Sequence, residues 1–384
     1  MGFVTNAPPS VTASASAATI IAGFGATFTA TAAGTPPLSY QWYFNTNTLI
    51  ASATNSAYTL PAIQTGDAGV YTVIVTNLYG LATNSASVSV LPNGSSLLTT
   101  QIWSLAPGSR PYLTTDNNQR GLAFDPVLNR VVLVSRSSTN GVHLLDADTG
   151  ADAGELDYSA LLAFTPPGTF PINMTGVGDD GAVYVANLIT SGTADTFAIY
   201  RWDSATPTAS VVPAYYDNPG LGRIGDTLAV RGAGVNTEIL ASFRTGTNVA
   251  LFTTGDGVNF SFNLITITNL PDDAQANGFA GLGLAFGPGN TFWAKSTGFN
   301  LRQVAYDLAS NSGSVIATYV LPGTEAPIGV DNTNGYVAAI GVSESPQNPS
   351  VATWEMSLFA PGTGSSTTLV VSVNANTAWA ACAA

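Results

Sequence analysis

The stretch that decides the fold of the first part of the chain is Asp67-Ala68-Gly69-Val70-Tyr71-Thr72-Val73-Ile74-Val75-Thr76-Asn77. Its second half is rich in Val, Ile, Thr and Tyr, which is typical of a β-strand. Asp67, Gly69 and Tyr71 occupy alternate positions at the start of this strand. The pattern predicts a tight corner over 64–69 that leads into a β-strand over 70–77.

Short alternating segments with turn residues between them lie on both sides of this strand. Asp67 is the only charged residue among the first 96. Either Thr, Ser and Asn alone keep this surface soluble, or the surface is not all exposed to water. Alternation of faces and turn residues predict further strands at Ala26–Ala32, Ser39–Phe44, Ala57–Leu60 and Ala82–Val90. Trp42 lies inside the second of these strands, in Tyr40-Gln41-Trp42-Tyr43.

These motifs strongly resemble the I-set immunoglobulin-like modules of secreted bacterial proteins, over about residues 8–91. The resemblance implies a β-sandwich in which Trp42 is the core tryptophan and the Tyr71 hydroxyl bonds back to the upstream backbone near Asp67. Disulfide-bonded immunoglobulin domains carry cysteines at the positions of Ala30 and Val73. Both positions are apolar here, so burial has to replace the ~2–4 kcal/mol that such a disulfide contributes.

The remainder of the chain shows a loose repeat of about fifty residues. Each unit has an apolar strand marked by glycine, a tight Asp/Asn/Gly turn and a second strand, which is how the blades of a β-propeller read. Five units are clear, and they begin near residues 121, 175, 226, 281 and 328. A strand over Thr99–Leu105 that pairs with the end of the chain would add a sixth blade. The similarity is to β-propeller-like domains of secreted bacterial proteins; a β-sandwich or an irregular β-solenoid is the alternative.

The sequence therefore predicts an all-β protein with two domains. An immunoglobulin-like β-sandwich without the usual disulfide is expected over residues 1–92, and a short linker of turn residues over 93–96. A five- or six-bladed β-propeller is expected over residues 97–384.

Composition excludes several classes of partner. Charged residues are 9% of the chain, the net charge is -13 and Lys295 is the only lysine. Nucleic acids and anionic membrane surfaces both require clustered Lys or Arg, and the nine arginines form no basic stripe. No apolar run reaches the roughly 18 residues that a membrane helix needs, so we predict no membrane insertion.

Asp146, Asp148, Asp152 and Asp157 form the strongest candidate for a metal site. Alternating carboxylates around a glycine could bind Ca²⁺ through oxygen ligands. The calcium-loop pattern requires Gly at the sixth position and Glu at the twelfth, whereas glycines here fall at the fifth and ninth, Gly150 and Gly154. An ordinary Asp-Thr-Gly hairpin turn is therefore favoured, with calcium as the alternative and no other cofactor expected.

No catalytic constellation is recognisable, so we predict no catalytic residues and no enzyme activity. His143 is the only histidine, and no G-x-S-x-G segment accompanies it, so neither a zinc site nor a serine triad is expected. Four arginines lie close together in sequence and are interpreted as ion-pairing residues or as a rim that binds an anion or a uronate: Arg110, Arg120, Arg130 and Arg136. Cys382 is interpreted as a small apolar residue, or as a site of an intermolecular disulfide or of lipid or thiol attachment.

Low charge and the absence of a catalytic pattern favour an extracellular structural or adhesive protein at a bacterial cell surface. It would be a subunit of a filament, sheath or layer that assembles with itself through charge-poor β surfaces. The unpaired stretch Met1–Ser10 could add a strand to a neighbouring copy. The alternatives are a secreted propeller that binds a glycan or peptide, with the immunoglobulin-like domain as a spacer, and a propeller lyase or hydrolase.

Overall fold

The fold is described from a computed structural model of the chain. The structure describes residues 6–15, 19–22, 25–45, 47–91, 102–114, 118–136, 141–159, 168–191, 195–270, 278–296, 299–319, 328–331, 336–342, 354–361 and 367–375, and after residue 330 the backbone alone. Two compact units are present, residues 1–97 with 332–336 and residues 98–331 with 337–384. The predicted linker, 93–96, lies outside the described residues.

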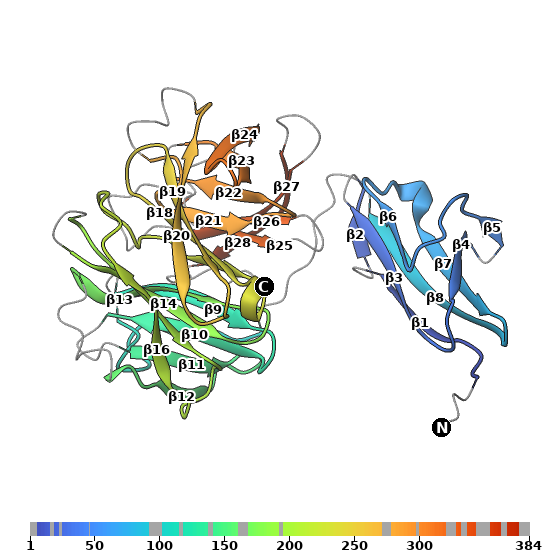
Figure 1. The fold of residues 1–384 in the computed structure, drawn as a ribbon, viewed down its shortest axis with the longest axis horizontal. Helices are drawn as coiled ribbons and strands as arrows, with labels where there is room; N and C mark the ends of the chain where they lie inside the picture. The colour runs from blue at the N-terminus through green and yellow to red at the C-terminus, as the bar shows by residue number, and fades with distance from the viewer. Residues whose placement is uncertain are drawn as a thin grey trace. The chain divides into compact units, whose positions relative to one another are not determined.

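The first unit is a sandwich of two sheets (Figure 1). The three-stranded sheet has the order β1 (Ser10–Ala15), β3 (Ala26–Ala33) and β6 (Ala57–Leu60). The five-stranded sheet has the order β2 (Thr19–Ile21), β8 (Gly80–Leu91), β7 (Gly69–Asn77), β4 (Ser39–Phe44) and β5 (Thr48–Leu49). The predicted strands agree with β3, β4, β6, β7 and β8 to within two residues at either end, and the predicted corner contains a 3-10 turn at Thr65–Asp67.

The second unit consists, in its described residues, of antiparallel meanders of four strands each. The sheets have the orders β12-β11-β10-β9, β13-β14-β15-β16 and β25-β26-β27-β28, and an eight-stranded sheet has the order β17-β18-β19-β20-β24-β23-β22-β21. This larger sheet divides into two meanders, because β20 and β24 are parallel and pair over two residues only, Thr266↔Ser312 and Ile267↔Gly313. The chain is thus all-β, with helix limited to short 3-10 turns among the described residues.

Each predicted repeat corresponds to one of these meanders. The strands of the first three meanders are β9 (Gln119–Asp125), β10 (Arg130–Ser135), β11 (Gly141–Asp146), β12 (Asp152–Leu156), β13 (Phe170–Val177), β14 (Val183–Leu188), β15 (Phe197–Trp202), β16 (Val211–Asp217), β17 (Ala229–Arg231), β18 (Glu238–Ser242), β19 (Asn248–Thr254) and β20 (Phe260–Ile267). Those of the last two are β21 (Gly283–Phe286), β22 (Thr291–Lys295), β23 (Leu301–Asp307), β24 (Ser312–Tyr319), β25 (Ile328–Asp331), β26 (Tyr336–Val342), β27 (Trp354–Pro361) and β28 (Thr367–Ala375).

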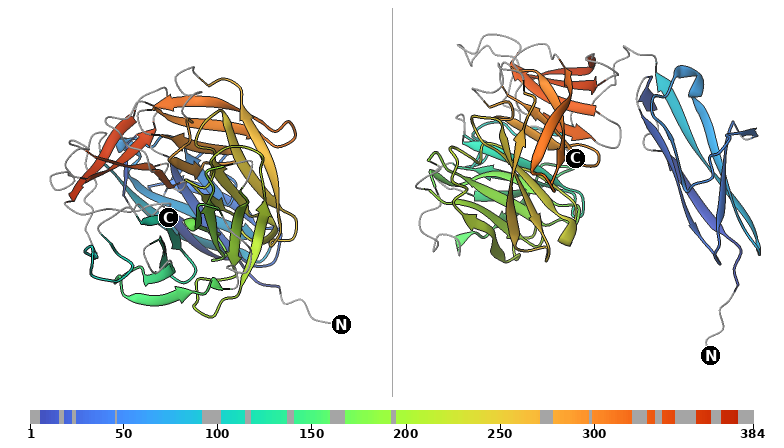
Figure 2. Two further views of the ribbon diagram at one scale, coloured as in Figure 1. Left: turned by 90° about the vertical axis from the view of Figure 1, so that its left-hand side faces the viewer. Right: turned by 45° about the horizontal axis from the view of Figure 1, so that its top comes forward.

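Successive meanders pack face to face in chain order. Val134 and Leu144 of the first contact Val185 and Tyr200 of the second within one buried cluster. Similar apolar clusters join the second meander to the third and the third to the fourth. The first strands of neighbouring meanders also lie together, β9 by β13, β13 by β17, β17 by β21 and β21 by β25. In Figure 2, left, the teal, green, yellow, orange and red strands follow one another around a common centre.

The expected sixth blade does not form from residues 102–105, which adopt no strand; residues 99–101 lie outside the described part of the chain. Instead, the segment 102–113 covers the face of the first meander that is opposite the second meander. Trp103, Tyr112 and Leu113 pack there against Leu133 and Leu145. Apolar side chains spaced irregularly in this segment favour packing on an existing sheet over adding a strand to it.

No helix in the described residues is long and apolar enough to span a membrane.

Candidate functional site

The corner of the first unit is held by bonds between side chains and backbone. The Tyr71 hydroxyl donates to the Asp67 carbonyl at 3.0 Å, and the Asp67 carboxylate accepts from the Gln64 amide at 2.8 Å. Trp42 is fully buried, and its indole N–H donates to the Asn55 carbonyl at 3.0 Å. These residues therefore occupy the structural positions that the resemblance implied.

Aromatic packing occupies the place of the missing disulfide. Ala30 is 5% exposed and Val73 is fully buried, so both line the core between the sheets. The rings of Phe28 and Tyr71 are stacked with centroids 3.8 Å apart, and Phe28 also contacts Trp42 at 6.3 Å. Such ring pairs add roughly 0.5–1.5 kcal/mol beyond the area that they bury.

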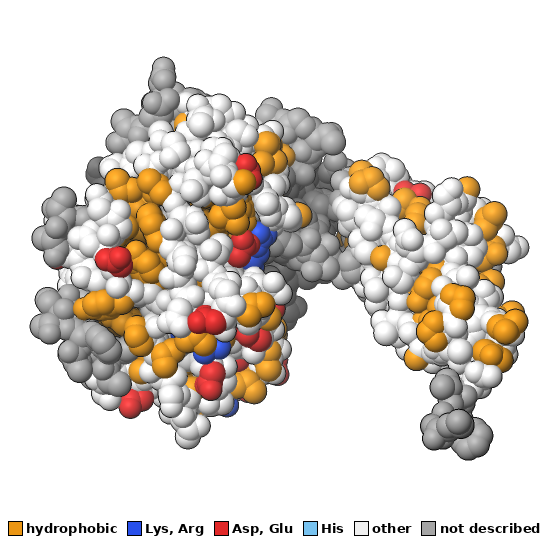
Figure 3. Space-filling view, in the orientation of Figure 1, with side chains coloured by type: hydrophobic (Ala, Val, Ile, Leu, Met, Phe, Trp, Pro, Cys, Tyr) orange, Lys and Arg blue, Asp and Glu red, His pale blue; other side chains and the backbone are white. Residues whose placement is uncertain are grey.

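The five-stranded sheet presents an outward face without a charged residue. Strand register places Tyr43 beside Leu49, Gln41 beside Ile74 and Thr76 beside Leu81 on this side. Leu49 is 57% exposed and Leu81 is 66% exposed. The view of the first unit in Figure 3 is white and orange, with one small red area and no blue. We define the apolar residues of this side as the outward face: Tyr43, Leu49, Val70, Ile74 and Leu81.

The N-terminal stretch is not free to add a strand elsewhere over residues 7–15. The Ala7 carbonyl accepts bonds from the Thr35 amide at 3.2 Å and from the Asn77 side chain at 2.8 Å. From Ser10 onward the chain pairs with β3 of its own unit. The prediction of an unpaired N-terminus is therefore wrong for these residues, because the sandwich satisfies their backbone internally.

The predicted calcium candidates serve a hairpin and its surroundings. One carboxylate oxygen of Asp146 accepts from the Asp148 amide at 3.2 Å and from the Thr149 amide and hydroxyl at 2.9 and 2.7 Å. These bonds hold the pKa of Asp146 below its usual value, and the bond from the Thr149 hydroxyl has the largest effect. Asp148 accepts from Asn129 instead.

The other two candidates point to separate partners. Asp152 accepts bonds from Arg110 at 2.7 Å and from the Tyr112 hydroxyl, and Asp157 caps Ser159 at 2.8 Å. The four carboxylates are therefore not brought together, and no group of three or more metal-ligating side chains occurs in the described part of the chain.

His143 lies beneath the segment 102–113. Its ring stacks on Tyr112, and its Nδ1 is 3.8 Å from the Glu155 carboxylate across the β11–β12 pair. Burial lowers the pKa of His143 to about 4, and burial raises the pKa of Glu155. His143 is therefore neutral at pH 7, in keeping with a packing role.

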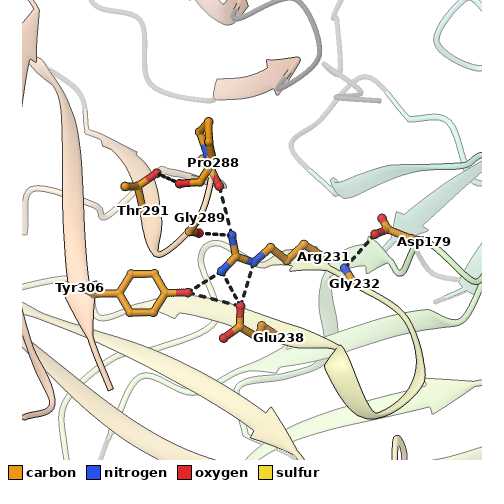
Figure 4. A network of polar contacts seen from close by, with 9 residues as sticks. Asp179, Arg231, Gly232, Glu238, Pro288, Gly289, Thr291 and Tyr306 are labelled. Carbon is orange, nitrogen blue, oxygen red and sulfur yellow. Dashed lines mark hydrogen bonds and ion pairs between the residues drawn. The ribbon is translucent and has the colours of Figure 1, made fainter. Parts of the chain in front are cut away.

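A polar network around Arg231 joins the third meander to the fourth (Figure 4). Its guanidinium donates to Glu238 at 2.5 and 2.8 Å, to the carbonyls of Gly287 and Gly289 at 3.1 and 2.5 Å, and to the Tyr306 hydroxyl at 2.6 Å. It also lies over the Phe286 ring, 4.3 Å from the centroid. The pKa of Tyr306 is raised to about 12, and burial is the largest cause. With its donors this fully engaged, Arg231 acts as a clamp between sheets.

Sequence reasoning missed this clamp. Arg231 and Tyr306 are 75 positions apart, and neither stands in a motif. One part of the network could have been predicted. Arg231 ends a strand in a chain with few cations, and Glu238 follows seven residues later, so an ion pair between the two could be expected.

The four arginines that lie close together in sequence separate in space. Arg110 pairs with Asp152, and Arg130 donates to the Ala205 carbonyl. Arg120 lies at the start of β9 and Arg136 directly after the end of β10, so the two lie together at one end of the sheet. There Arg136 donates to Asn173 at 3.0 Å and covers the Phe170 ring. Of the four arginines, only Arg120 and Arg136 therefore lie close together. Cys382 lies outside the described residues.

Comparison with known proteins bears on the first unit. The family model described as the immunoglobulin domain matches residues 8–77. Chimeric titin Z1Z2 carrying an exogenous peptide from decorin is 22% identical, with a TM-score of 0.21, over 23% of this chain and 99% of that chain. The ectodomain of mouse nectin-like molecule 4 is 24% identical, with a TM-score of 0.22, over 24% of this chain and 33% of that one.

The four N-terminal immunoglobulin domains of a Dscam1 isoform are 22% identical, with a TM-score of 0.19, over 21% of each chain. This chain thus spans about a fifth of that Dscam1 structure. No curated protein sequence matches the chain. The matched family, together with the corner at Tyr71 and the buried Trp42, shows that residues 8–77 form an immunoglobulin-like domain.

Proposed function

We propose that this protein is an extracellular structural or adhesive protein that associates with a second copy of itself through the outward face of its immunoglobulin-like domain. The observation that carries the proposal is the outward face itself, with Leu49 and Leu81 exposed and no charge on its strands. Immunoglobulin-like domains are typical of adhesion or surface proteins, so the family match over residues 8–77 supports a surface role.

An uncharged face can be buried at a low desolvation cost. Exposed charges on a sheet oppose association, because each must be desolvated or paired when two faces meet. Here the neighbours of the apolar residues are Thr, Ser and Gln, which can bond across an interface at little cost. Burying a Leu side chain stabilises by roughly 1.5–3 kcal/mol when it is complete, so several such residues on each copy favour a symmetric contact.

The finer features of the fold belong to the same proposal. We take residues 1–92 as an I-set domain of bacterial origin and residues 97–384 as a β-propeller with the described meanders as its blades. The sequential face-to-face packing of the meanders supports this arrangement. The protein would act as a non-enzymatic subunit of a surface filament, sheath or layer, without a required cofactor.

Sedimentation velocity over a range of concentrations tests the association. The average mass of the natural protein should rise with concentration, and Leu49→Lys/Leu81→Lys should remain monomeric. Ile316→Lys is the matched control, because Ile316 is 54% exposed on β24 of the other unit. A natural protein that stays monomeric throughout, or a control that loses association equally, would show the proposal to be wrong.

A further inference from the structure

Four of the nine arginines lie at one end of the first three meanders. Arg120 lies at the start of β9 and Arg136 directly after β10. Arg223 precedes β17 and Arg244 follows β18. Because neighbouring strands of these meanders are antiparallel, the start of a first strand and the end of a second strand share one end of the sheet. We call these four residues the arginine end.

Hydrogen bonds connect the arginine end across three meanders. Arg136 donates to the Asn173 side-chain oxygen at 3.0 Å, and the Asn173 amide donates to the Gly225 carbonyl at 2.6 Å. The Arg244 amide donates to the Arg223 carbonyl at 2.9 Å. Asn173 is fully buried between these partners. The four arginines therefore follow one continuous polar path along this end, and do not occupy separate surfaces.

Arg120 joins the same path through the packing of the first strands. Gly121 lies so close to the backbone of Met174 and Thr175 that a Cβ would approach the Thr175 amide to 2.6 Å. The residue before Gly121 therefore lies beside the start of β13, where Asn173 receives the bond from Arg136.

Among the described residues, this path holds four arginines and a single bonded carboxylate. Asp226 is the one carboxylate that is bonded into it among the described residues, and Arg223 holds it through two bonds of 2.5 and 2.6 Å. Arg120 and Arg244 are both half-buried, and neither enters an ion pair in the part of the chain that the structure describes. The Arg120 Nε is buried without a hydrogen-bond partner.

Half-buried guanidinium groups without a counterion are unfavourable, because they lose water without gaining a partner. Arg120 and Arg244 are such groups among the described residues, although the chain has a net charge of -13 and carboxylates are plentiful. A guanidinium presents a planar fork that matches a carboxylate in two parallel hydrogen bonds. An external carboxylate would supply the counterion that Arg120 and Arg244 do not find among the described residues.

We propose that the arginine end binds an acidic polysaccharide that carries uronate carboxylates. A polymer is favoured over a single small anion because Arg120 belongs to the first meander and Arg244 to the third, with Asn173 of the second between them. A nucleic acid is disfavoured because neutralising its phosphates takes a larger cluster of cations than the four residues of the arginine end. This binding role is independent of self-association through the outward face.

Microscale thermophoresis of the full chain with polygalacturonate at low ionic strength tests the proposal, with neutral dextran as the uncharged probe and sodium sulfate as the small anion. The natural protein should bind polygalacturonate and ignore dextran. Arg120→Gln/Arg244→Gln should weaken binding by roughly tenfold or more. Arg201→Gln is the matched control, since Arg201 lies at the other end of β15, and should bind like the natural protein.

Thermal unfolding separates loss of a site from loss of the fold. Removing two half-buried guanidinium groups that pair with no described carboxylate should leave the melting temperature of the protein unchanged or raise it. Polygalacturonate should raise the melting temperature of the natural protein only. The proposal is overturned if the double variant binds polygalacturonate as well as the natural protein, if dextran binds equally, or if sulfate alone binds.

Discussion

The ring of Tyr112 lies almost parallel to the imidazole of His143, with centroids 3.8 Å apart and 12° between the planes. This stack joins the segment 102–113 to the first meander and leaves His143 only 7% exposed. A histidine in such a position resists protonation, because the charged form would lose most of its hydration.

Stability of the second unit should therefore depend on His143 in mild acid. Burial lowers the pKa of His143 to about 4 from a value of about 6.5 in the unfolded chain. As pH falls between these values, the unfolded chain binds a proton that the folded chain does not, so the folded state loses up to about 2–3 kcal/mol. His143→Phe keeps the stack and removes this loss. Denaturant unfolding of the natural protein and of His143→Phe at pH 7 and 4.5 measures this loss of stability. Equal losses in the two proteins would show that His143 is not its cause.

Tyr71→Phe should destabilise the immunoglobulin-like domain by about 1 kcal/mol, because the 3.0 Å bond to the Asp67 carbonyl is lost in a buried corner. Tyr79→Phe is the control, since Tyr79 is 42% exposed at the β7–β8 turn and its hydroxyl supports no corner. Urea unfolding of the domain reports both changes. Equal effects of the two substitutions would mean that the corner bond contributes nothing.

Ala30→Cys/Val73→Cys should form a disulfide across the sandwich. Both side chains are buried between β3 and β7, at the positions that cysteines occupy in disulfide-bonded immunoglobulin domains. Oxidation should raise the stability of the domain by roughly 2–4 kcal/mol. Mass spectrometry in a Cys382→Ser background detects the bond, and reduction should reverse the gain. Two free thiols after oxidation would show that Phe28 and Trp42 hold the strands in a different spacing.

Arg231→Gln should destabilise the second unit by roughly 2–4 kcal/mol, because Glu238 and two carbonyl groups lose their donor in a mostly buried place. Arg231→Lys should recover less than half of this loss, since one ammonium group cannot reach all of these partners. Arg201→Gln should cost less, as Arg201 makes one bond of 3.3 Å to Tyr184. Thermal unfolding compares the three, and full rescue by lysine would argue against the clamp.

Chelation should leave the stability of the chain unchanged. Asp146 already accepts bonds from Thr149 and Asp148, and the neighbouring carboxylates serve other partners. Asp146→Ala should lower the melting temperature slightly, because the turn loses its hydrogen bonds to the carboxylate. Calorimetry with EDTA and with added calcium distinguishes a hairpin turn from a calcium site. A rise in melting temperature with calcium would support the calcium site.

The sequence by itself determined the strands and the corner. Alternation with a period of two depends only on which neighbours face the core, so β4 and β6 could be predicted to the residue. The bond between Tyr71 and Asp67 spans four positions, and a short segment can encode such a contact. The same applies to the turn at Asp146, whose donors lie within three residues.

Only the tertiary structure decided which distant side chains meet. The sequence grouped Arg110, Arg120, Arg130 and Arg136 because they are close along the chain, yet the strand directions send them to different ends of the sheet. Arg231 and Tyr306, 75 positions apart, and Asn173 and Gly225, 52 apart, come together because whole sheets pack on one another. Local patterning fixes where a strand lies and which of its faces is buried, whereas the partner of each polar side chain depends on the sheet that packs against it.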